Sequence, residues 1–121
     1  MSAFQTNPTT RSELNPRLLA SGLLTTTDAP LYTCPSDRRA VITSLVFCNV
    51  TALAATFRLH HVVPWATSST GNAQYYDSRL NANVTVIDGS TRWLDSGDEL
   101  RGRASAASSA SFAIYGYETG A

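Results

Sequence analysis

The sequence predicts an all-β protein, folded as a single antiparallel β-sandwich of about eight strands with an extended N-terminal arm. From residue 17 onward, short segments rich in β-branched and aromatic residues alternate apolar and polar positions, which is the period of a strand. Turn-forming residues separate these segments about every 8 to 12 residues, a spacing typical of sandwiches and barrels. Residues 10–19 are the one window that admits a helical stripe, so parallel βαβ units are excluded.

The length of the chain favours one domain. With 121 residues, it can bury about two thirds of its unfolded surface and needs no disulfide or structural metal to fold. Residues 1–16 are polar, include two prolines and follow neither a helical nor a strand period. We therefore expect an arm at residues 1–16, frayed or ordered against a neighbour, and a sandwich domain at residues 17–121.

The first half of the domain begins with a weak strand at residues 17–24 (RLLASGLL). Residues 28–30 turn the chain into a short strand at residues 31–34, and a tight hairpin is expected around residues 35–38. The strongest strand follows at residues 39–50 (RAVITSLVFCNV), which is dense in β-branched and aromatic residues.

Both faces of the strand at residues 39–50 are largely apolar. One face is expected to hold Val41, Thr43, Leu45 and Phe47, and the other Ile42, Ser44, Val46 and Cys48. This pattern predicts a central strand, with one face in the core and the other covered by a neighbour. The strand is therefore a candidate for subunit contact, together with the aromatic last strand.

The middle of the chain holds one clear strand, one loop and one edge strand. Residues 55–63 (ATFRLHHVV) alternate cleanly, with His61 in the apolar phase and His60 in the polar phase. His61 is therefore expected in the core or an interface, with a hydrogen-bonded partner. Residues 64–73 read as a loop, and residues 74–78 as a short edge strand.

The last third of the chain predicts four further strand segments. A compact strand at residues 84–87 is closed by an Asp-Gly turn, and residues 93–94 form a stub. Residues 99–103 and 111–118 are strands, joined by a small-residue hairpin loop at residues 104–110. In the last strand, Phe112, Ile114 and Gly116 share one face, and Ala113, Tyr115 and Tyr117 share the other.

Charge and hydropathy exclude two classes of partner. Nine basic residues, all of them arginine, balance nine acidic residues, so the basic excess of a nucleic-acid-binding protein is missing. No run of 18 apolar residues is present, so no membrane-spanning helix is expected. The N-terminus lacks the basic start and apolar stretch of a signal peptide, which makes export by the general secretory route unexpected.

The two cysteines are expected to be reduced. A hairpin around residues 35–38 would leave Cys34 and Cys48 on the order of 25 Å apart at strand rise. A disulfide needs Cα atoms within about 7 Å. We therefore predict two partly buried thiols.

No catalytic, cofactor or metal site is predicted. The only two histidines, His60 and His61, are neighbours on a strand and face opposite sides, and no Gly-x-Ser-x-Gly nucleophile elbow is present. No glycine-rich phosphate loop and no zinc-ligand spacing occur. A calcium site remains an alternative for the acidic turns, but turn chemistry explains these residues as well. The acidic residues concerned are Asp88, Asp95, Asp98 and Glu99.

Three aromatic residues lie in or beside the middle loop: Trp65, Tyr75 and Tyr76. Exposed together, they would form a sugar-binding platform or a protein hot spot. Alternatively, they cover the open end of the sandwich.

Two stretches resemble a known family. Residues 31–50 (LYTCPSDRRAVITSLVFCNV) resemble a recurring opening in small tailed-phage virion proteins, in which a Tyr-Thr-x-Pro turn and a basic step precede an Ile/Val-rich strand. Residues 96–101 (SGDELR) and 112–118 (FAIYGYE) look like the closing hairpin of the same family. The resemblance covers roughly residues 22–118. It implies a jelly-roll-like β-sandwich in a phage particle and no catalytic residues, and Cys34 at the turn departs from the family in detail.

The first functional hypothesis is therefore a capsid decoration (cement) protein, present in the virion and assembled in the host cytoplasm. We expect a homo-oligomer, with a trimer favoured, in contact with the major capsid protein or other virion proteins. A second hypothesis is a neck, tail, baseplate or fibre-attachment component with the same fold. A third, from a different class, is a carbohydrate-binding module. The candidate interface residues are Phe4, Arg11, Arg38, Arg39, Arg58, Trp65, Tyr75, Tyr76, Tyr115 and Tyr117.

Overall fold

The computed structural model describes residues 15–120, and these residues form nine strands and one short 3-10 helix. The predicted arm at residues 1–16 therefore lies outside the described residues, apart from its last two positions. The elements are β1 (Arg17–Leu23), β2 (Ala29–Thr33), β3 (Arg38–Asn49), β4 (Ala55–Val62), η1 (Thr70–Asn72), β5 (Ala73–Leu80), β6 (Thr85–Asp88), β7 (Arg92–Leu94), β8 (Glu99–Ala104) and β9 (Ala110–Gly120).

Nearly every predicted strand is present, within a few residues of its expected bounds. The helical alternative at residues 10–19 is wrong where it can be checked, because residues 17–19 belong to β1. The expected loop after β4 contains the short η1, and the expected edge strand is β5, which is longer than predicted. None of the described residues belongs to a helix with the length and hydropathy needed to cross a membrane.

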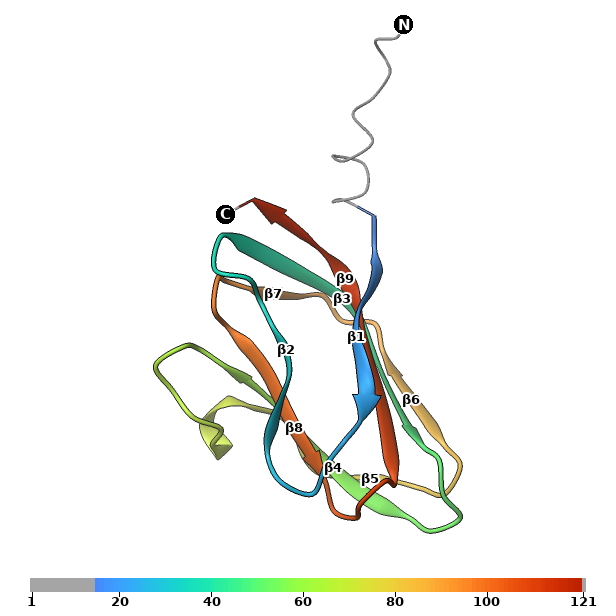
Figure 1. Cartoon of the computed structure of the whole chain (residues 1–121). Helices are drawn as coiled ribbons and strands as arrows, with labels where there is room; N and C mark the ends of the chain where they lie inside the picture. The colour runs from blue at the N-terminus through green and yellow to red at the C-terminus, as the bar shows by residue number, and fades with distance from the viewer. Residues whose placement is uncertain (1–14, 121) are drawn as a thin grey trace, which may run out of the picture.

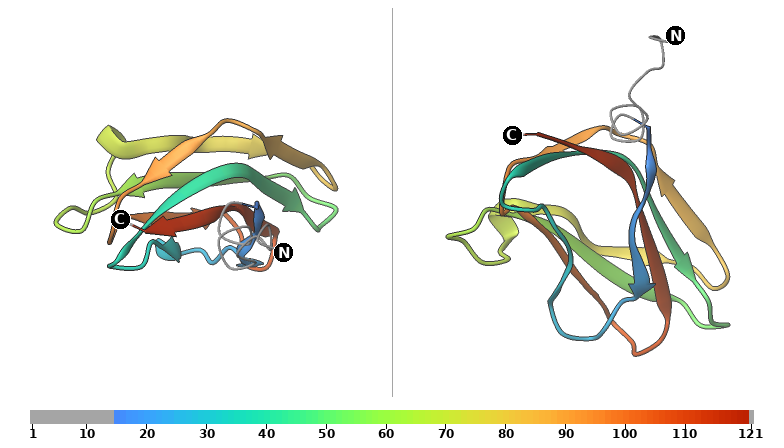
Figure 2. Two further views of the ribbon diagram at one scale, coloured as in Figure 1. Left: turned by 90° about the horizontal axis from the view of Figure 1, so that it is seen from above. Right: turned by 45° about the horizontal axis from the view of Figure 1, so that its top comes forward.

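The strands form two antiparallel sheets, which face each other in Figures 1 and 2. Sheet A has the order β1-β9-β3-β6, with β7 also paired to β3, and sheet B has the order β2-β8-β4-β5. β1 pairs with β9, β2 with β8, β3 with β6 and β7, and β4 with β5. This nested pairing is that of one long hairpin rolled up, which is the jelly-roll topology that the sequence resemblance implied.

The count of strands follows from the same topology. β6 and β7 both lie along the same edge of β3, β6 against its end and β7 against its beginning. The nine strands therefore occupy eight positions of the jelly roll. β1 runs alongside β9 in Figure 1, and Arg17 at the start of β1 pairs with Gly116 of β9.

Two predicted hairpins are wrong. The turn at residues 35–38 joins β2 of sheet B to β3 of sheet A, and the loop after β8 joins sheet B to β9 of sheet A. Both segments carry turn-forming residues. Such residues occur in connections between two sheets as well as in hairpins within one sheet. Cys34 and Cys48 consequently belong to opposite layers, and both are free thiols.

The faces predicted for β3 are wrong in part, because the strand contains a β-bulge. The register between β3 and β9 shifts between Ile42 and Ser44, so the residues before and after this point follow different phases. Ile42 before the bulge, and Leu45 and Phe47 after it, lie in the core. Val41, predicted to share a face with Leu45 and Phe47, lies on the other side. The prediction of a central strand is confirmed, since β3 has neighbours on both edges.

The core lies between the two sheets and is aromatic at one end. Phe47 of β3 stacks on Phe57 of β4, with ring centroids 4.5 Å apart, and the ring of Tyr75 lies 5.0 Å from that of Phe57. In β9, Phe112 and Ile114 face the core, which confirms the alternation predicted for the last strand.

Candidate functional site

Part of the outer face of sheet A carries mostly apolar side chains. Residues paired across neighbouring strands share a face of the sheet, and three rows of such pairs run across β9 and β3. The rows join Leu18 to Tyr115 and Ser44, Tyr117 to Val41 and Trp93, and Ala113 to Val46 and Ile87. None of these nine side chains is charged. We call them the apolar face.

Several side chains of the apolar face are well exposed. Ile87 is 70% exposed, Trp93 65%, Leu18 51% and Tyr115 37%. The outer face of an antiparallel sandwich sheet is normally polar, because water covers it. Exposed apolar side chains grouped on one face are typical of surfaces that contact other macromolecules.

The outer face of sheet B is charged. Arg58 of β4 donates two hydrogen bonds to the carboxylate of Asp77, at 2.6 and 3.0 Å, and its guanidinium lies 4.0 Å from the centre of the Tyr76 ring. Arg103 of β8 is the partner of Arg58 across the sheet. The hydrogen bonds from Arg58, with the charges of Arg58 and Arg103, hold the pKa of Asp77 below its usual value.

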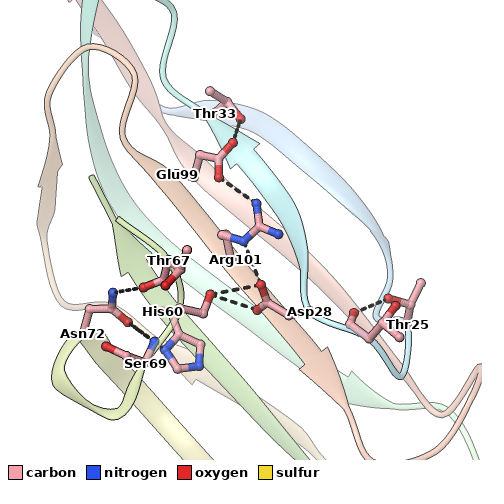
Figure 3. A network of polar contacts seen from close by, with 11 residues as sticks. Thr25, Asp28, Thr33, His60, Thr67, Ser69, Asn72, Glu99 and Arg101 are labelled. Atoms are coloured by element: carbon pink, nitrogen blue, oxygen red, sulfur yellow. Dashed lines mark hydrogen bonds and ion pairs between the residues drawn. The ribbon is translucent and has the colours of Figure 1, made fainter. Parts of the chain in front are cut away.

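A second network ties a loop to sheet B (Figure 3). Asp28 accepts a hydrogen bond of 2.7 Å from Arg101 of β8 and is bonded by the hydroxyl of Ser68 at 3.0 Å. Arg101 also donates to Glu99 at 2.8 Å. The hydrogen bonds that Arg101 donates, to Glu99 first and then to Asp28, raise the pKa of Arg101. Asp28 therefore clamps the segment after β4 against β8.

His60 is buried, although its polar phase predicted an exposed position. Its Nδ1 lies 2.9 Å from Oδ1 of Asn72, and Asn72 also donates to the carbonyl of Thr67 at 2.9 Å. The loop that ends in η1 thus covers His60 and leaves it 4% exposed. His61, predicted in the core, is half-exposed at the rim, where its Nε2 lies 2.9 Å from Oδ2 of Asp98. Its expected hydrogen-bonded partner is confirmed.

Two hollows lie side by side on sheet B. One of about 320 Å³ is lined by Arg58, Asp77 and Arg103 with neighbouring residues of β4 and β8. The other, of about 340 Å³, shares the two arginines. Its remaining lining residues are Asp28, His60, Ser68, Ser69, Thr70 and Tyr76.

The three aromatics of the middle segment do not form a platform. Tyr75 packs against Phe47 and Phe57 at the core. Tyr76 contacts Arg58 on the outer face, and Trp65 is 85% exposed in the loop.

The remaining predicted interface residues are scattered. Tyr115 and Tyr117 belong to the apolar face, and Arg58 to the charged face. Arg39 forms an ion pair of 3.5 Å with Asp95, and Arg38 begins β3. Phe4 and Arg11 lie outside the described residues.

Sequence reasoning missed the residues that complete both faces. Leu18, Ile87 and Trp93 are the three most exposed members of the apolar face, and their only signal was an apolar side chain in a short or weak strand. Arg103 and Asp77 complete the charged face. Arg103 shares a cross-strand pair with Arg58, which only the register reveals.

The acidic turns do not form a cluster of ligands. Asp88 accepts hydrogen bonds from Arg92 and Tyr75, and Asp98 contacts His61 and the backbone of Asp95. Within residues 15–120, no three His, Cys, Asp or Glu side chains are grouped so that they could hold a metal ion.

Comparison with known proteins adds little. No family model and no curated protein matches the chain. Among solved structures, a chain in the structure of infectious bursal disease virus Gx strain is similar, with 14% sequence identity and a TM-score of 0.42. The match covers 85% of this chain and 31% of that chain, so this protein spans about a third of that chain's length. A likeness of this degree carries no argument about function.

Proposed function

We propose that this chain is a virion structural protein, a capsid decoration protein that stabilises a phage head through contacts between jelly-roll subunits. It acts by binding and carries out no reaction. The observation that carries the proposal is the apolar face of sheet A. The resemblance of residues 31–50 and 96–118 to small tailed-phage virion proteins supports the phage assignment.

Burial of the apolar face provides the energy for assembly. Complete burial of a large apolar side chain contributes about 1.5 to 3 kcal/mol, and Ile87, Trp93 and Leu18 are each more than half exposed in the single chain. Tyrosine and tryptophan are enriched at the centres of protein interfaces, where they contribute most of the affinity. Trp93 and Tyr115 are therefore the expected anchors.

The proposed occupant of this face is a second copy of the chain. A face with a net charge would repel its own copy, whereas the rows of the apolar face are uncharged and the whole chain has a formal net charge of zero. Closed rings of identical subunits are the usual outcome of such self-association, and we favour a trimer.

Size-exclusion chromatography with light scattering tests self-association. We expect the full chain to be oligomeric. In a Trp93→Ser/Tyr115→Ser double variant, the affinity between subunits should fall by at least tenfold. Leu53→Ser is the matched control, because Leu53 is 78% exposed but lies in the turn between β3 and β4. A wild-type chain that stays monomeric at high micromolar concentration would overturn the proposal. Mass spectrometry of purified phage particles tests the virion role, and failure to detect the chain in them would refute it.

A further inference from the structure

We infer that the hollows on the outer face of sheet B form a binding site for an acidic sugar, a saccharide that carries a carboxylate, with Arg103 as its anchor. The site lies on the sheet opposite the apolar face. It is therefore independent of the proposed virion role, and either one can fail without the other.

The charges of two neighbouring arginines favour an anionic ligand. Arg58 and Arg103 are direct partners on neighbouring antiparallel strands, a placement in which like charges destabilise the sheet. Among the described residues, Asp77 is the one carboxylate bonded to this pair, and it bonds to Arg58. Within residues 15–120, Arg103 has no hydrogen bond or ion pair of its own, whereas Arg101 on the same strand has two carboxylate partners. The trio of Arg58, Asp77 and Arg103 thus carries a net charge of +1.

The shape of this surface also suits a small ligand. The unmatched guanidinium of Arg103 lines both hollows, and each has the volume of a small ligand site. Residues that carry hydroxyl groups also line the hollows, Thr56 and Ser105 in one and Ser68, Ser69 and Thr70 in the other. Hydroxyls, a partly exposed tyrosine and a histidine form a lining suited to a polyhydroxylated ligand.

The side chains around the hollows are held in place by contacts within the sheet and its loops. Arg58 is fixed by its paired hydrogen bonds to Asp77 and by its contact with Tyr76. Asp77 itself has a φ of 52°, in the left-handed region, beside a bulge between β4 and β5. Such a conformation costs free energy and persists where the surroundings enforce it, often at functional sites. Asp28 holds Ser68 in place on the opposite wall.

The charge of the lining selects the ligand. A guanidinium binds a planar carboxylate with two parallel hydrogen bonds. A dianionic phosphate would meet the carboxylates of Asp77 and Asp28, which line the two hollows. One unmatched positive charge therefore suits a singly charged carboxylate, and the hydroxyl-rich walls suit the sugar ring that bears it.

Titration calorimetry and NMR on the full chain test the site with glucuronate and galacturonate. Glucose is the neutral control, acetate reports a bare carboxylate, and inorganic phosphate reports a simple anion. We expect at least one uronate to bind more tightly than all three controls. Arg103→Gln should weaken that binding by about tenfold or more, because it removes the positive charge and the paired hydrogen bonds to the carboxylate. Arg103→Lys should restore only part of the affinity, since it keeps the charge without the paired hydrogen bonds.

Arg79→Gln is the matched control. It removes one positive charge from β5 of the same sheet, but Arg79 lines neither hollow, so uronate affinity should stay unchanged. Equal melting temperatures for the wild type and the variants exclude a folding effect. The inference is overturned if no uronate binds, if acetate or phosphate binds as tightly as the uronates, or if Arg103→Gln leaves the affinity unchanged.

Discussion

Cys34 and Cys48 show how one residue type acquires two environments. The Cys34 side chain is buried beneath the start of β3, where its thiol lies 3.4 Å from the carbonyl oxygen of Arg38. Burial first, and then the nearby carboxylates of Glu118 and Asp98, raise the pKa of this thiol. Cys48 is only half-buried near the end of β3.

These environments predict a difference in thiol reactivity. Because only the thiolate reacts, we expect iodoacetamide at pH 8 to modify Cys48 at least tenfold faster than Cys34 in the native chain. The measurement is peptide mass spectrometry over time, on the Trp93→Ser/Tyr115→Ser variant so that a subunit contact cannot shield Cys48. In denaturant the two rates should converge. Equal rates in the native chain would contradict the environment described for Cys34.

The histidines mark the limit of sequence reasoning for single residues. Alternation assigned His60 and His61 to opposite faces, and their different partners agree with this. Alternation could not foresee that a loop would cover His60, or that the sheet would end close to His61. Burial at a given position depends on segments distant in sequence, and these leave no trace in the local pattern.

Among the strands, β9 shows why a glycine is required at one position. An added Cβ at Gly116 would lie 2.1 Å from the carbonyl oxygen of Val41 and 3.0 Å from the Cα of Ile42. Both contacts are with backbone of β3 beside its bulge, which cannot move away without breaking the register. Only a residue without a side chain allows this approach of the two strands.

Gly116→Ala should therefore destabilise the chain by about 1 to 3 kcal/mol, the range for an overpacked interior, or by more if the bulge is lost. The measurement is the free energy of unfolding from urea titration. Gly120→Ala in the same strand is the control, since an added Cβ there meets nothing within 4 Å. If the two variants were equally stable, the close approach at the bulge would be refuted.

Strand positions were predictable from the sequence, whereas bulges were not. The alternation of Phe112 and Ile114 with Tyr115 and Tyr117 predicted both faces of β9, because that strand keeps one phase. In β3 the same reasoning misplaced Val41, since one inserted residue reverses the phase. The sequence therefore predicted only part of the apolar face, namely Tyr115 and Tyr117. Its other members could be identified only from the pairing of residues between neighbouring strands.

At the scale of the whole molecule, local turn signals do not define the topology. Residues 35–38 and 104–110 both predicted hairpins, yet each carries the chain from one sheet to the other. The pairing of β1 with β9 and of β2 with β8 joins segments far apart in sequence. The jelly roll was available only through the sequence resemblance, because turn chemistry alone does not say which strands will meet.

Side chains also join the two layers at their margins. At one margin, Tyr32 of sheet B donates a hydrogen bond to Glu118 of sheet A, and burial followed by this contact raises the pKa of the tyrosine. At another, Asp88 at the end of β6 accepts hydrogen bonds of 2.8 Å from Arg92 and 2.5 Å from Tyr75 of sheet B. The Asp88 contact therefore connects β5 to β6 and β7.

The Asp88 contact predicts a pH dependence of stability. The hydrogen bonds from Arg92 and then Tyr75 hold the pKa of Asp88 well below its ordinary value in the folded chain. A depressed pKa stabilises the folded state at pH values above the ordinary value of about 4, and this contribution is lost as the pH falls toward the folded value. Asp88→Asn should lower the free energy of unfolding at pH 7 by about 2 to 4 kcal/mol, because it weakens charged hydrogen bonds.

Urea titrations at pH 7, 5 and 3 measure this dependence. The stability of the wild type should fall more steeply than that of Asp88→Asn between pH 5 and pH 3, so that the two curves converge. Asp37→Asn, a change at an exposed aspartate in the turn before β3, should keep the slope of the wild type. Parallel curves for the wild type and Asp88→Asn would show that the carboxylate of Asp88 does not join the two sheets.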